Sequence, residues 1–174
     1  LPMKSHPLAL FCYCPRCGSA AFTVADSRSK RCADCHFTYY ANASASAAAV
    51  VRNAQGELLL VRRAFAPAAG TLCFPGGFAE HGESLETTCL RELQEETGLH
   101  GHAPKFLFSL PNLYVYSELT VHTLDSFFAV SVDDETALFA DDDASAAEWH
   151  PLSPDLLDGI ALSSHREALR RLLK

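Results

Sequence analysis

The segment from residue 77 to residue 99 constrains the fold of this chain more than any other stretch, and it reads GFAEHGESLETTCLRELQEETGL. Ser84 belongs to the residue types that cap helix N-termini, and Gly98 belongs to those that end helices. Glu86 would lie in the first turn, where a negative charge interacts favourably with the helix dipole. The segment therefore predicts a helix over residues 85–97.

The predicted helix carries acidic and apolar residues on different faces. Glu92, Glu95 and Glu96 stand at i, i+3 and i+4, so their side chains share one face. Leu90 and Leu93 point about a third of a turn away and can pack against a core. An acidic surface exposed to solvent is the ordinary interpretation of such a face. The alternative is a divalent cation site, because three neighbouring carboxylates repel each other and Mg²⁺ or Mn²⁺ prefers hard oxygen ligands.

The spacing of the whole segment is more specific than its acidity. Nine defined positions occur in register from Gly77 onward: Gly, five residues, Glu, seven residues, and then Arg-Glu-apolar-any-Glu-Glu-any-Gly-apolar. This pattern is the Nudix box, and the chain therefore resembles the Nudix hydrolase superfamily. The resemblance implies an α/β fold, the Nudix α/β/α sandwich with a mixed β-sheet. It also implies hydrolysis of the pyrophosphate bond in a nucleoside diphosphate that is linked to another group.

The resemblance further implies roles for the residues at the matching positions. Glu92, Glu95 and Glu96 would bind magnesium, and one of them, or a carboxylate from a later loop, would act as the general base. Arg91 would pair with Glu83 and hold the preceding loop against the helix. An ordinary surface ion pair is the alternative interpretation of Arg91.

Two CxxC pairs near the N-terminus, separated by fourteen residues, predict a second metal site. The four residues are Cys14, Cys17, Cys32 and Cys35. Their spacing is typical of a four-cysteine zinc ribbon, whose closed tetrahedral site is structural. Disulfides, redox chemistry and a ligand set shifted to include Cys12 are the alternatives, with His6 and His36 as spare donors nearby. We expect a zinc ribbon over residues 1–41 and a Nudix domain over residues 42–174.

Composition and charge exclude several classes of protein. The 174 residues are 48% hydrophobic and 20% charged, which is typical of a globular domain with a small appendage. No apolar run reaches the roughly 18 residues of a membrane span, and no secretory h-region is seen, so a cytoplasmic protein is expected. Residues 1–40 carry five basic and two acidic side chains, whereas the remainder carries nine basic and nineteen acidic ones. An acidic body does not favour extended nucleic-acid binding, so a small nucleotide-type substrate is the expected partner.

Apolar runs and turn residues predict the remaining elements. We expect strands over residues 38–40, 46–52, 57–63, 104–110 and 121–132, and helices over 153–158 and 164–174. The stretch 64–76 contains several Gly and Pro residues and is expected to be mostly loop, with a short strand leading into the box. The acidic, alanine-rich stretch 133–148 is also expected to be a loop. In the family a carboxylate of this region often serves as a further metal ligand or base, which points to Asp143 or Glu148.

Six residues outside the acidic face are candidates for substrate binding. Arg62 and Arg63 close a predicted strand and could reach a phosphate, although exposed charges at a strand end are the ordinary alternative. The others are two glycines that let the backbone approach a diphosphate and two aromatic residues that could stack on a base: Gly76, Gly77, Tyr114 and Tyr116. Core packing is the alternative for each tyrosine.

A zinc ribbon ahead of a Nudix box is similar to the NADH pyrophosphatase branch of the superfamily. That branch carries a Ser-Gln-Pro-Trp-Pro-Phe run beyond the box. Here Ser109 and Pro111 match that run, whereas Leu110 and residues 112–114 do not. The resemblance implies NADH, ADP-ribose or a compound of related shape as substrate. Members of the family often dimerise, so a homodimer is one expectation.

Two other functions stay open at this point. A non-catalytic ligand sensor or regulator could use the same scaffold, although a protein that only binds has no need of every glutamate. An RNA-end (cap) processing hydrolase is the third interpretation, and it is supported by basic residues of the ribbon, Arg16, Arg28, Lys30 and Arg31.

Overall fold

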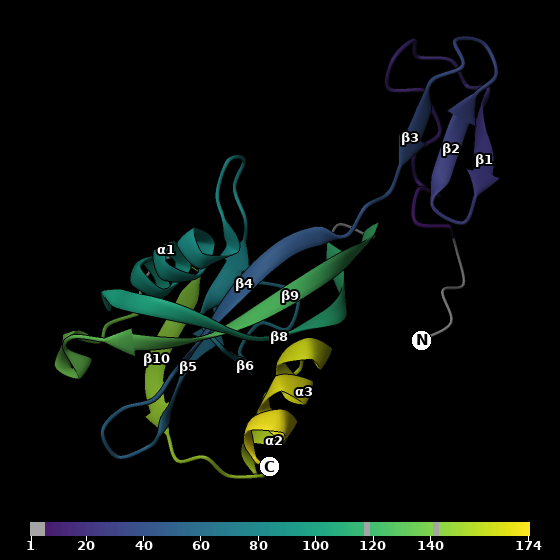
Figure 1. Cartoon of the computed structure of the whole chain (residues 1–174). Coiled ribbons are helices and arrows are strands. Elements are labelled where there is room, and N and C mark those ends of the chain that lie inside the picture. Colours follow the sequence, from purple (N-terminus) through teal and green to yellow (C-terminus); the bar gives the residue numbers. More distant parts are fainter. Residues whose placement is uncertain (1–5, 117–118, 141–142) are drawn as a thin grey trace. The chain divides into compact units, whose positions relative to one another are not determined.

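The computed structural model describes residues 6–116, 119–140 and 143–174, which form two compact units (Figure 1). The first unit comprises Leu1–Ala43 and Val115–Val121, and the second comprises Ser44–Tyr114 and His122–Lys174. None of the helices in the described part of the chain is long and apolar enough to cross a membrane.

The first unit is built around a small antiparallel sheet and a cluster of four cysteines. Its strands lie in the order β1 (Phe22–Asp26), β2 (Ser29–Cys32) and β3 (Thr38–Tyr40). The last of these is the strand predicted over residues 38–40. The core is small and consists of Cys14, Phe22 and Cys32, with Phe11, Cys35 and Phe37 packed against it. So small a core stabilises a fold only weakly, and such units usually depend on a metal or on disulfides.

The described residues of the second unit form two sheets, three α-helices and a short 3₁₀ helix, Glu135–Ala137. One sheet has the order β7-β4-β9-β8 and the other has the order β10-β5-β6. The seven strands are β4 (Ser44–Val51), β5 (Leu58–Arg63), β6 (Leu72–Cys73), β7 (Gly76–Phe78), β8 (Gly101–Tyr116), β9 (Leu119–Val132) and β10 (Ala144–His150). Strand β4 runs parallel to β9 and antiparallel to β7, so the sheet is mixed, as the resemblance implied.

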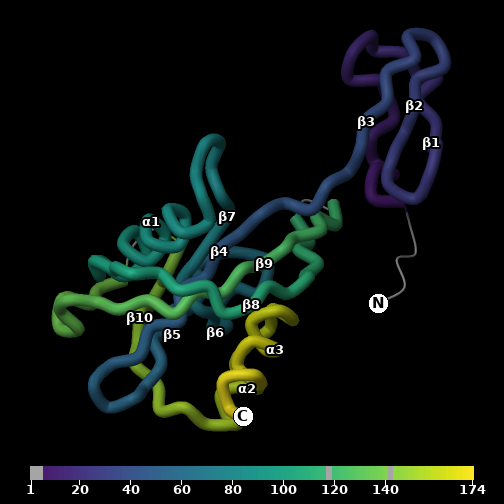
Figure 2. The backbone as a smooth tube through the Cα atoms, in the orientation of Figure 1, coloured from purple at the N-terminus to yellow at the C-terminus, as the bar shows by residue number. Residues whose placement is uncertain are grey.

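The central strands β4 and β5 are largely buried on both faces because helices cover the sheets from opposite sides (Figure 2). Helix α1 (Leu85–Thr97) packs on one side, and α2 (Leu156–Gly159) and α3 (Ser163–Leu172) pack on the other. Alternation along β4 divides its side chains accordingly, since Ala47 packs in the cluster with Leu93 and Ala48 in the cluster with Leu169. This arrangement is the expected α/β/α sandwich.

Helix α1 begins and ends where the sequence predicted. The Ser84 hydroxyl accepts a hydrogen bond from the Thr87 backbone N–H at 3.2 Å. Gly98 adopts the left-handed conformation, with φ of 71°, and its N–H donates to the Gln94 carbonyl oxygen at 2.8 Å. A Cβ at Gly98 would collide with the ring of Phe139. Glycine at this position therefore serves both the helix cap and the close packing of the following loop.

The predicted loop over residues 133–148 is wrong in its second half. Residues 144–150 form β10, which pairs antiparallel with the buried strand β5, so that Ala147 lies opposite Val61 and Trp149 opposite Leu59. The segment is rich in alanine and has weak intrinsic β-propensity. Its conformation is therefore decided by pairing with β5, which is distant in the sequence.

The predicted strand over residues 104–110 is too short, because β8 continues through Pro111 to Tyr116. Proline is compatible with this position because β8 is the edge strand of its sheet. The two C-terminal helices also differ slightly in length from the predictions. Helix α2 starts at Leu156 rather than at residue 153, and α3 ends at Leu172.

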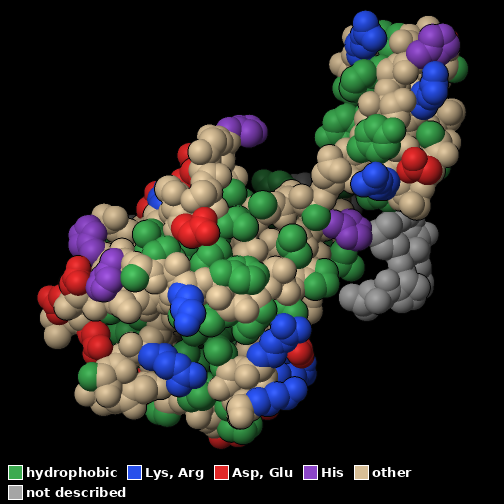
Figure 3. All heavy atoms as spheres, in the orientation of Figure 1, with side chains coloured by type: hydrophobic (Ala, Val, Ile, Leu, Met, Phe, Trp, Pro, Cys, Tyr) green, Lys and Arg blue, Asp and Glu red, His purple; other side chains and the backbone are tan. Residues whose placement is uncertain are grey.

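The surface over α3 carries a group of basic side chains (Figure 3). Arg170 and Arg171 lie in the last turn of α3, where cations interact favourably with the helix dipole. Both guanidinium groups also pair with Glu167, at 3.6 and 3.5 Å. The group is therefore explained by helix electrostatics, and α3 packs on the sheet through Ala168, Leu169 and Leu172.

Candidate active site

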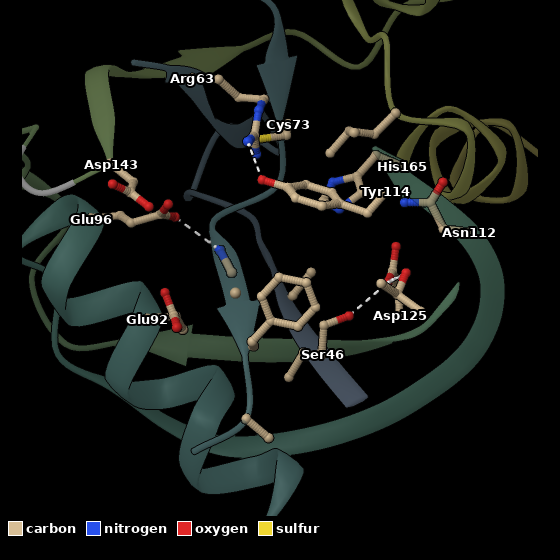
Figure 4. A pocket seen from close by; sticks show the side chains of 18 of the residues that line it. Ser46, Arg63, Cys73, Glu92, Glu96, Asn112, Tyr114, Asp125, Asp143 and His165 are labelled. Carbon is tan, nitrogen blue, oxygen red and sulfur yellow. Dashed lines mark hydrogen bonds between the residues drawn. The ribbon is translucent and has the colours of Figure 1, made fainter. Parts of the chain in front are cut away.

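The second unit contains a cavity of about 440 Å³ beside helix α1, bounded by β4, β7 and the start of α3. Most of the candidate residues from the sequence line it: Arg63, Gly76, Gly77, Arg91, Glu92, Glu95, Glu96 and Tyr114. Asp143 lines it as well. Figure 4 shows Glu92, Glu96 and Asp143 together on one side of the cavity, which we call the acidic end.

The acidic end exists because α1 packs closely on the sheet. Leu93 lies about a third of a turn round the helix from Glu92 and is fully buried in the core, and this packing leaves Glu92 and Glu96 to line the cavity. A Cβ at Gly77 would collide with the Glu92 carboxylate, and a Cβ at Gly76 would collide with the carbonyl oxygen of Ala47. Both glycines are therefore required by close packing against other parts of the protein, and the approach of their backbone to a diphosphate stays a prediction.

Arg91 connects the loop before the helix to the acidic face. Its Nε and Nη2 donate to the two carboxylate oxygens of Glu83 at 2.8 and 3.0 Å, which is the pair expected from the sequence. Its Nη1 donates to Glu92 at 2.9 Å and to Glu95 at 2.8 Å. The hydrogen bonds from Arg91 lower the pKa of Glu83 to about 2. The hydrogen bonds to Glu83, Glu92 and Glu95 in turn raise the pKa of Arg91. Arg91 thus neutralises part of the charge that the glutamates bring together.

Glu96 is the most buried of the three glutamates, with 6% of its surface exposed. The Gly76 backbone N–H donates to its carboxylate at 2.9 Å. Burial raises the pKa of Glu96 to about 8, and the nearby charges of Glu92 and Asp143 add to this effect. A carboxylate held in such a place is stabilised by a positive charge, and the oxygen donors around it are those that Mg²⁺ or Mn²⁺ prefers. The residues at the acidic end therefore fit a divalent cation.

The raised pKa of Glu96 predicts how stability depends on pH in metal-free buffer. The native state holds a proton on Glu96 between its ordinary pKa of 4.5 and about 8, so the contribution of this group falls as the pH rises through that range. Glu96→Gln removes the penalty of the buried charge. In EDTA the variant should melt roughly 5 °C or more above the parent at about pH 9, and the difference should shrink toward about pH 5. A difference that is constant with pH, measured by calorimetry, would contradict the raised pKa.

Arg63 and Tyr114 line the cavity and contact each other. Arg63 Nη2 donates to the Tyr114 hydroxyl at 3.1 Å, and its Nε donates to the Pro67 carbonyl oxygen at 2.8 Å. The Tyr114 ring meets the ring of Phe78 edge to face, with 5.6 Å between the centroids. A guanidinium group, which can bind a phosphate, and two aromatic rings, which can stack on a base, thus line the same cavity as the acidic end.

Four candidates from the sequence do not line the cavity. Successive strand residues point to opposite faces, so Arg62 turns away from it and instead contacts the Gly70 carbonyl oxygen at 2.8 Å and Glu148 at 3.8 Å. Glu148 also lies 3.2 Å from His150. Tyr116 is 62% exposed and belongs to the segment that is part of the first unit. Glu83 contacts Arg91 but is not among the lining residues.

The other end of the cavity was not predicted from the sequence. It is lined by polar side chains that come from β4, β8, β9 and α3, namely the half-buried Ser46 and the buried Asn112, Thr123, Asp125 and His165. One signal was available, because Asp125 is the one acidic residue in a predicted strand that contains no Glu, Lys or Arg. His165 gave no comparable signal, since a histidine near the start of a helix is ordinarily a surface residue. We call this the polar end (Figure 4).

The four predicted cysteines of the first unit form one cluster. The ligand atoms of Cys14, Cys17, Cys32 and Cys35 all lie within 4.8 Å of one another. The sulfur atoms of Cys14 and Cys35 are 3.6 Å apart, and those of Cys17 and Cys32 are 3.7 Å apart. These distances are close to the separation of about 3.8 Å that two thiolates have on a tetrahedral zinc with Zn–S bonds of about 2.3 Å. The cluster therefore fits a structural zinc ion.

The spare donors near the cluster have other surroundings. Cys12 is exposed and lies outside the cluster. The ring of His6 is hydrogen-bonded to the Asp26 carbonyl oxygen at 2.8 Å, and His36 is exposed. All the cysteines in the structure are free thiols, so the disulfide alternative has no support.

Several characterised proteins are similar to this chain in sequence. It is 36% identical over 98 residues to the NAD-capped RNA hydrolase NudC of Stutzerimonas stutzeri, in a match that covers 56% of this chain and 34% of that protein. It is 34% identical over 99 residues to the ADP-ribose pyrophosphatase of Methanocaldococcus jannaschii, in a match that covers 56% of each protein. The matched segments thus span about a third to just over half of the length of these relatives.

Solved structures and a domain model extend the comparison to the fold. A NUDIX hydrolase from Nitrosomonas europaea superimposes with a TM-score of 0.71 at 20% identity, covering 92% of this chain and 89% of that one. The NUDIX domain of Shewanella oneidensis NrtR, solved in complex with ADP ribose, superimposes with a TM-score of 0.62 at 24% identity, covering 75% of this chain and 86% of that one. The sequence model of the NUDIX domain matches residues 43–172. Given this match over most of its length, the chain belongs to the NUDIX family.

Proposed function

We propose that this chain is a metal-dependent hydrolase that cleaves the pyrophosphate bond of a nucleoside diphosphate linked to another moiety, such as NADH or ADP-ribose. The acidic end of the cavity carries this proposal, because Glu92, Glu96 and Asp143 lie together beside the guanidinium group of Arg63. Such an arrangement suits a polyanionic substrate that is bound together with divalent cations. The names of relatives that act on NAD-capped RNA and on ADP-ribose support the same reaction class.

Glu92, Glu95 and Glu96 would hold the magnesium or manganese ions, with Asp143 adjacent to them. When bound, a divalent cation supplies charge neutralisation at the phosphate oxygens and lowers the pKa of a coordinated water. The backbone of Gly76 and Gly77, which lines the cavity, would lie beside the diphosphate.

The remaining side chains around the acidic end have distinct roles in this proposal. Arg63 would bind a phosphate oxygen, and Tyr114 would lie against the base. Arg91 is a positioning residue, because it joins Glu83 of the loop to the metal-binding face. Either Glu96 or Asp143 would accept the proton of the attacking water.

The cysteine cluster would hold a structural Zn²⁺ ion that orders residues 1–41, ahead of a Nudix domain over residues 42–174. The fit of the four sulfur atoms to a tetrahedral site supports this assignment. A zinc site with four thiolates leaves no open coordination position, so we assign it no part in the reaction. A cytoplasmic location and a homodimer stay predictions of the sequence analysis.

Hydrolysis of a substrate panel tests the proposed reaction. With Mg²⁺ present, we expect turnover of NADH, ADP-ribose, FAD or a diadenosine polyphosphate, with two phosphate-containing products from each molecule cleaved. EDTA should abolish this turnover. Binding of these compounds without any turnover would contradict a hydrolase and would favour a ligand sensor.

An RNA-end processing hydrolase is the second candidate, favoured by the basic residues of the first unit. The guanidinium group of Arg28 lies over the exposed ring of Tyr40, at 5.6 Å from the centroid, and such a pair can contact a nucleotide. Lys30 does not add to this surface, because it is 8% exposed and donates to the Phe11 carbonyl oxygen at 2.8 Å. Preferential cleavage of capped RNA in the same panel would favour this second candidate.

A further inference from the structure

The polar end of the cavity is organised around the carboxylate of Asp125, which is 5% exposed. The hydroxyl groups of Ser46 and Thr123 both donate to its Oδ1, each at 2.6 Å. The hydroxyl group of Ser164 donates to its Oδ2. These donors come from β4, β9 and α3, and Figure 4 shows the bond between Ser46 and Asp125 at the cavity wall.

This pattern leaves the carboxylate with capacity for one more hydrogen bond. An ionised carboxylate has about four acceptor positions, and three hydroxyl donors account for three of them. Two of the three donors share Oδ1, so the remaining position is on Oδ2. Because Asp125 lines the cavity, a ligand there can supply the fourth donor.

The cationic side chains that line the cavity have other partners. Arg63 is held by Pro67 and Tyr114, and Arg91 is held by the glutamates of the acidic end. The polar end therefore carries a negative charge that hydroxyl dipoles stabilise, and it repels a phosphate group.

His165 contributes a neutral hydrogen-bond donor to the same end. The Phe74 backbone N–H can only donate, so the Nδ1 atom of His165, at 3.1 Å, must accept. In the neutral ring Nε2 then carries the hydrogen atom. Burial lowers the pKa of His165 to about 4, so the ring stays neutral at ordinary pH. The polar end thus combines an anionic acceptor with a neutral donor.

We propose that the polar end binds an uncharged hydrogen-bond donor of the nucleoside, either an N–H group of the base or a hydroxyl group of the ribose, and that Asp125 selects it. This inference rests on the proposed function, and it orients the substrate. The diphosphate lies at the acidic end, and the donor-bearing part of the nucleoside lies at the polar end. A buried carboxylate with only a structural role is not expected here, because burying its charge costs free energy and apolar side chains of similar volume usually stabilise a core as well or better.

Binding of nucleoside monophosphates in Mg²⁺ buffer tests this assignment separately from hydrolysis, because these compounds have no pyrophosphate bond to cleave. The parent compound is AMP, and NMR titration measures its affinity for the whole chain. One arm replaces AMP by purine riboside monophosphate, which lacks the amino group of the base. The other arm replaces it by 2′,3′-dideoxy-AMP, which lacks both ribose hydroxyl groups. Because a hydrogen bond to a charged group is lost, the wild-type protein should bind one of the two analogues roughly 10-fold or more weakly than AMP. The group that this analogue lacks is the donor that Asp125 binds.

The variant Asp125→Asn keeps the size of the side chain and removes its charge. We expect it to bind AMP roughly 10-fold more weakly than the wild type does. It should also bind AMP about as well as it binds the analogue that the wild-type protein discriminates against. The matched control is Asp133→Asn, just beyond the end of the same strand, where the carboxylate is 77% exposed; it should bind as the wild type does.

Two results would overturn the proposal. The first is a wild-type protein that binds AMP and both analogues with equal affinity, a measurement that needs no variant to fold. The second is an Asp125→Asn protein in which the ratio of the affinity for AMP to the affinity for each analogue is the same as in the wild type. A carboxylate with only a structural role would change the affinities for AMP and for both analogues by the same factor. Absence of hydrolysis in the substrate panel would count against the proposed function. It would not affect the relative affinities for AMP and its analogues, so the two tests can fail independently.

Discussion

Glu92→Gln and Glu95→Gln are each expected to lower kcat/KM for the best substrate of the panel by about 10³-fold. Each substitution keeps the size of the side chain and an oxygen that can accept from Arg91, but it removes a charge from the acidic end. Cation binding contributes several kcal/mol of charge stabilisation to phosphoryl transfer, and about 4 kcal/mol corresponds to a factor of this size. The measurement is a steady-state assay over a range of Mg²⁺ concentrations.

Glu86→Gln is the matched control, because it makes the same change on the same helix at an exposed position outside the cavity. It should keep the activity of the parent and lose only the small favourable interaction of Glu86 with the helix dipole. Parallel titrations with Mn²⁺, followed by electron paramagnetic resonance, should show weaker binding in the two cavity variants alone. Rates equal to the parent in both variants would show that the acidic end has no catalytic role.

The second large effect is expected in the first unit, where Cys32→Ser should abolish zinc binding and unfold the ribbon. Cys32 is fully buried, and it belongs to both the cysteine cluster and the small core of that unit. A structural zinc site contributes about 10–16 kcal/mol in small zinc-binding modules, far more than so small a core can supply. The second unit has its own two core clusters and should stay folded.

Elemental analysis and amide hydrogen exchange measure these two effects separately. The wild-type chain should contain one zinc per molecule, and residues 22–40 should be protected from exchange only when zinc is bound. Cys12→Ser is the control, because Cys12 is exposed and lies outside the cluster; it should keep its zinc. One zinc per molecule in Cys32→Ser, or none in the wild type, would refute the assignment of the ribbon.

The sequence predicted those features that depend on neighbouring residues or on fixed spacing. The limits of α1 follow from its own caps, Ser84 and Gly98. The i, i+3 and i+4 spacing of the glutamates places them on one face of any helix. The contact of Arg91 with Glu83 was implied by the resemblance to the Nudix box, in which both positions are defined. These local preferences act before any long-range contact forms.

The tertiary structure decided what depends on contacts between distant segments. Strand β10 forms because Ala147 and Trp149 pair with β5, although its own composition indicates a loop. Of two adjacent arginines, only Arg63 lines the cavity, because the pleat of β5 turns Arg62 away. Likewise, Asp125 meets Ser46 across 79 positions of the chain. A local pattern cannot specify such a contact, because it depends on the parallel pairing of β4 with β9 in the folded sheet.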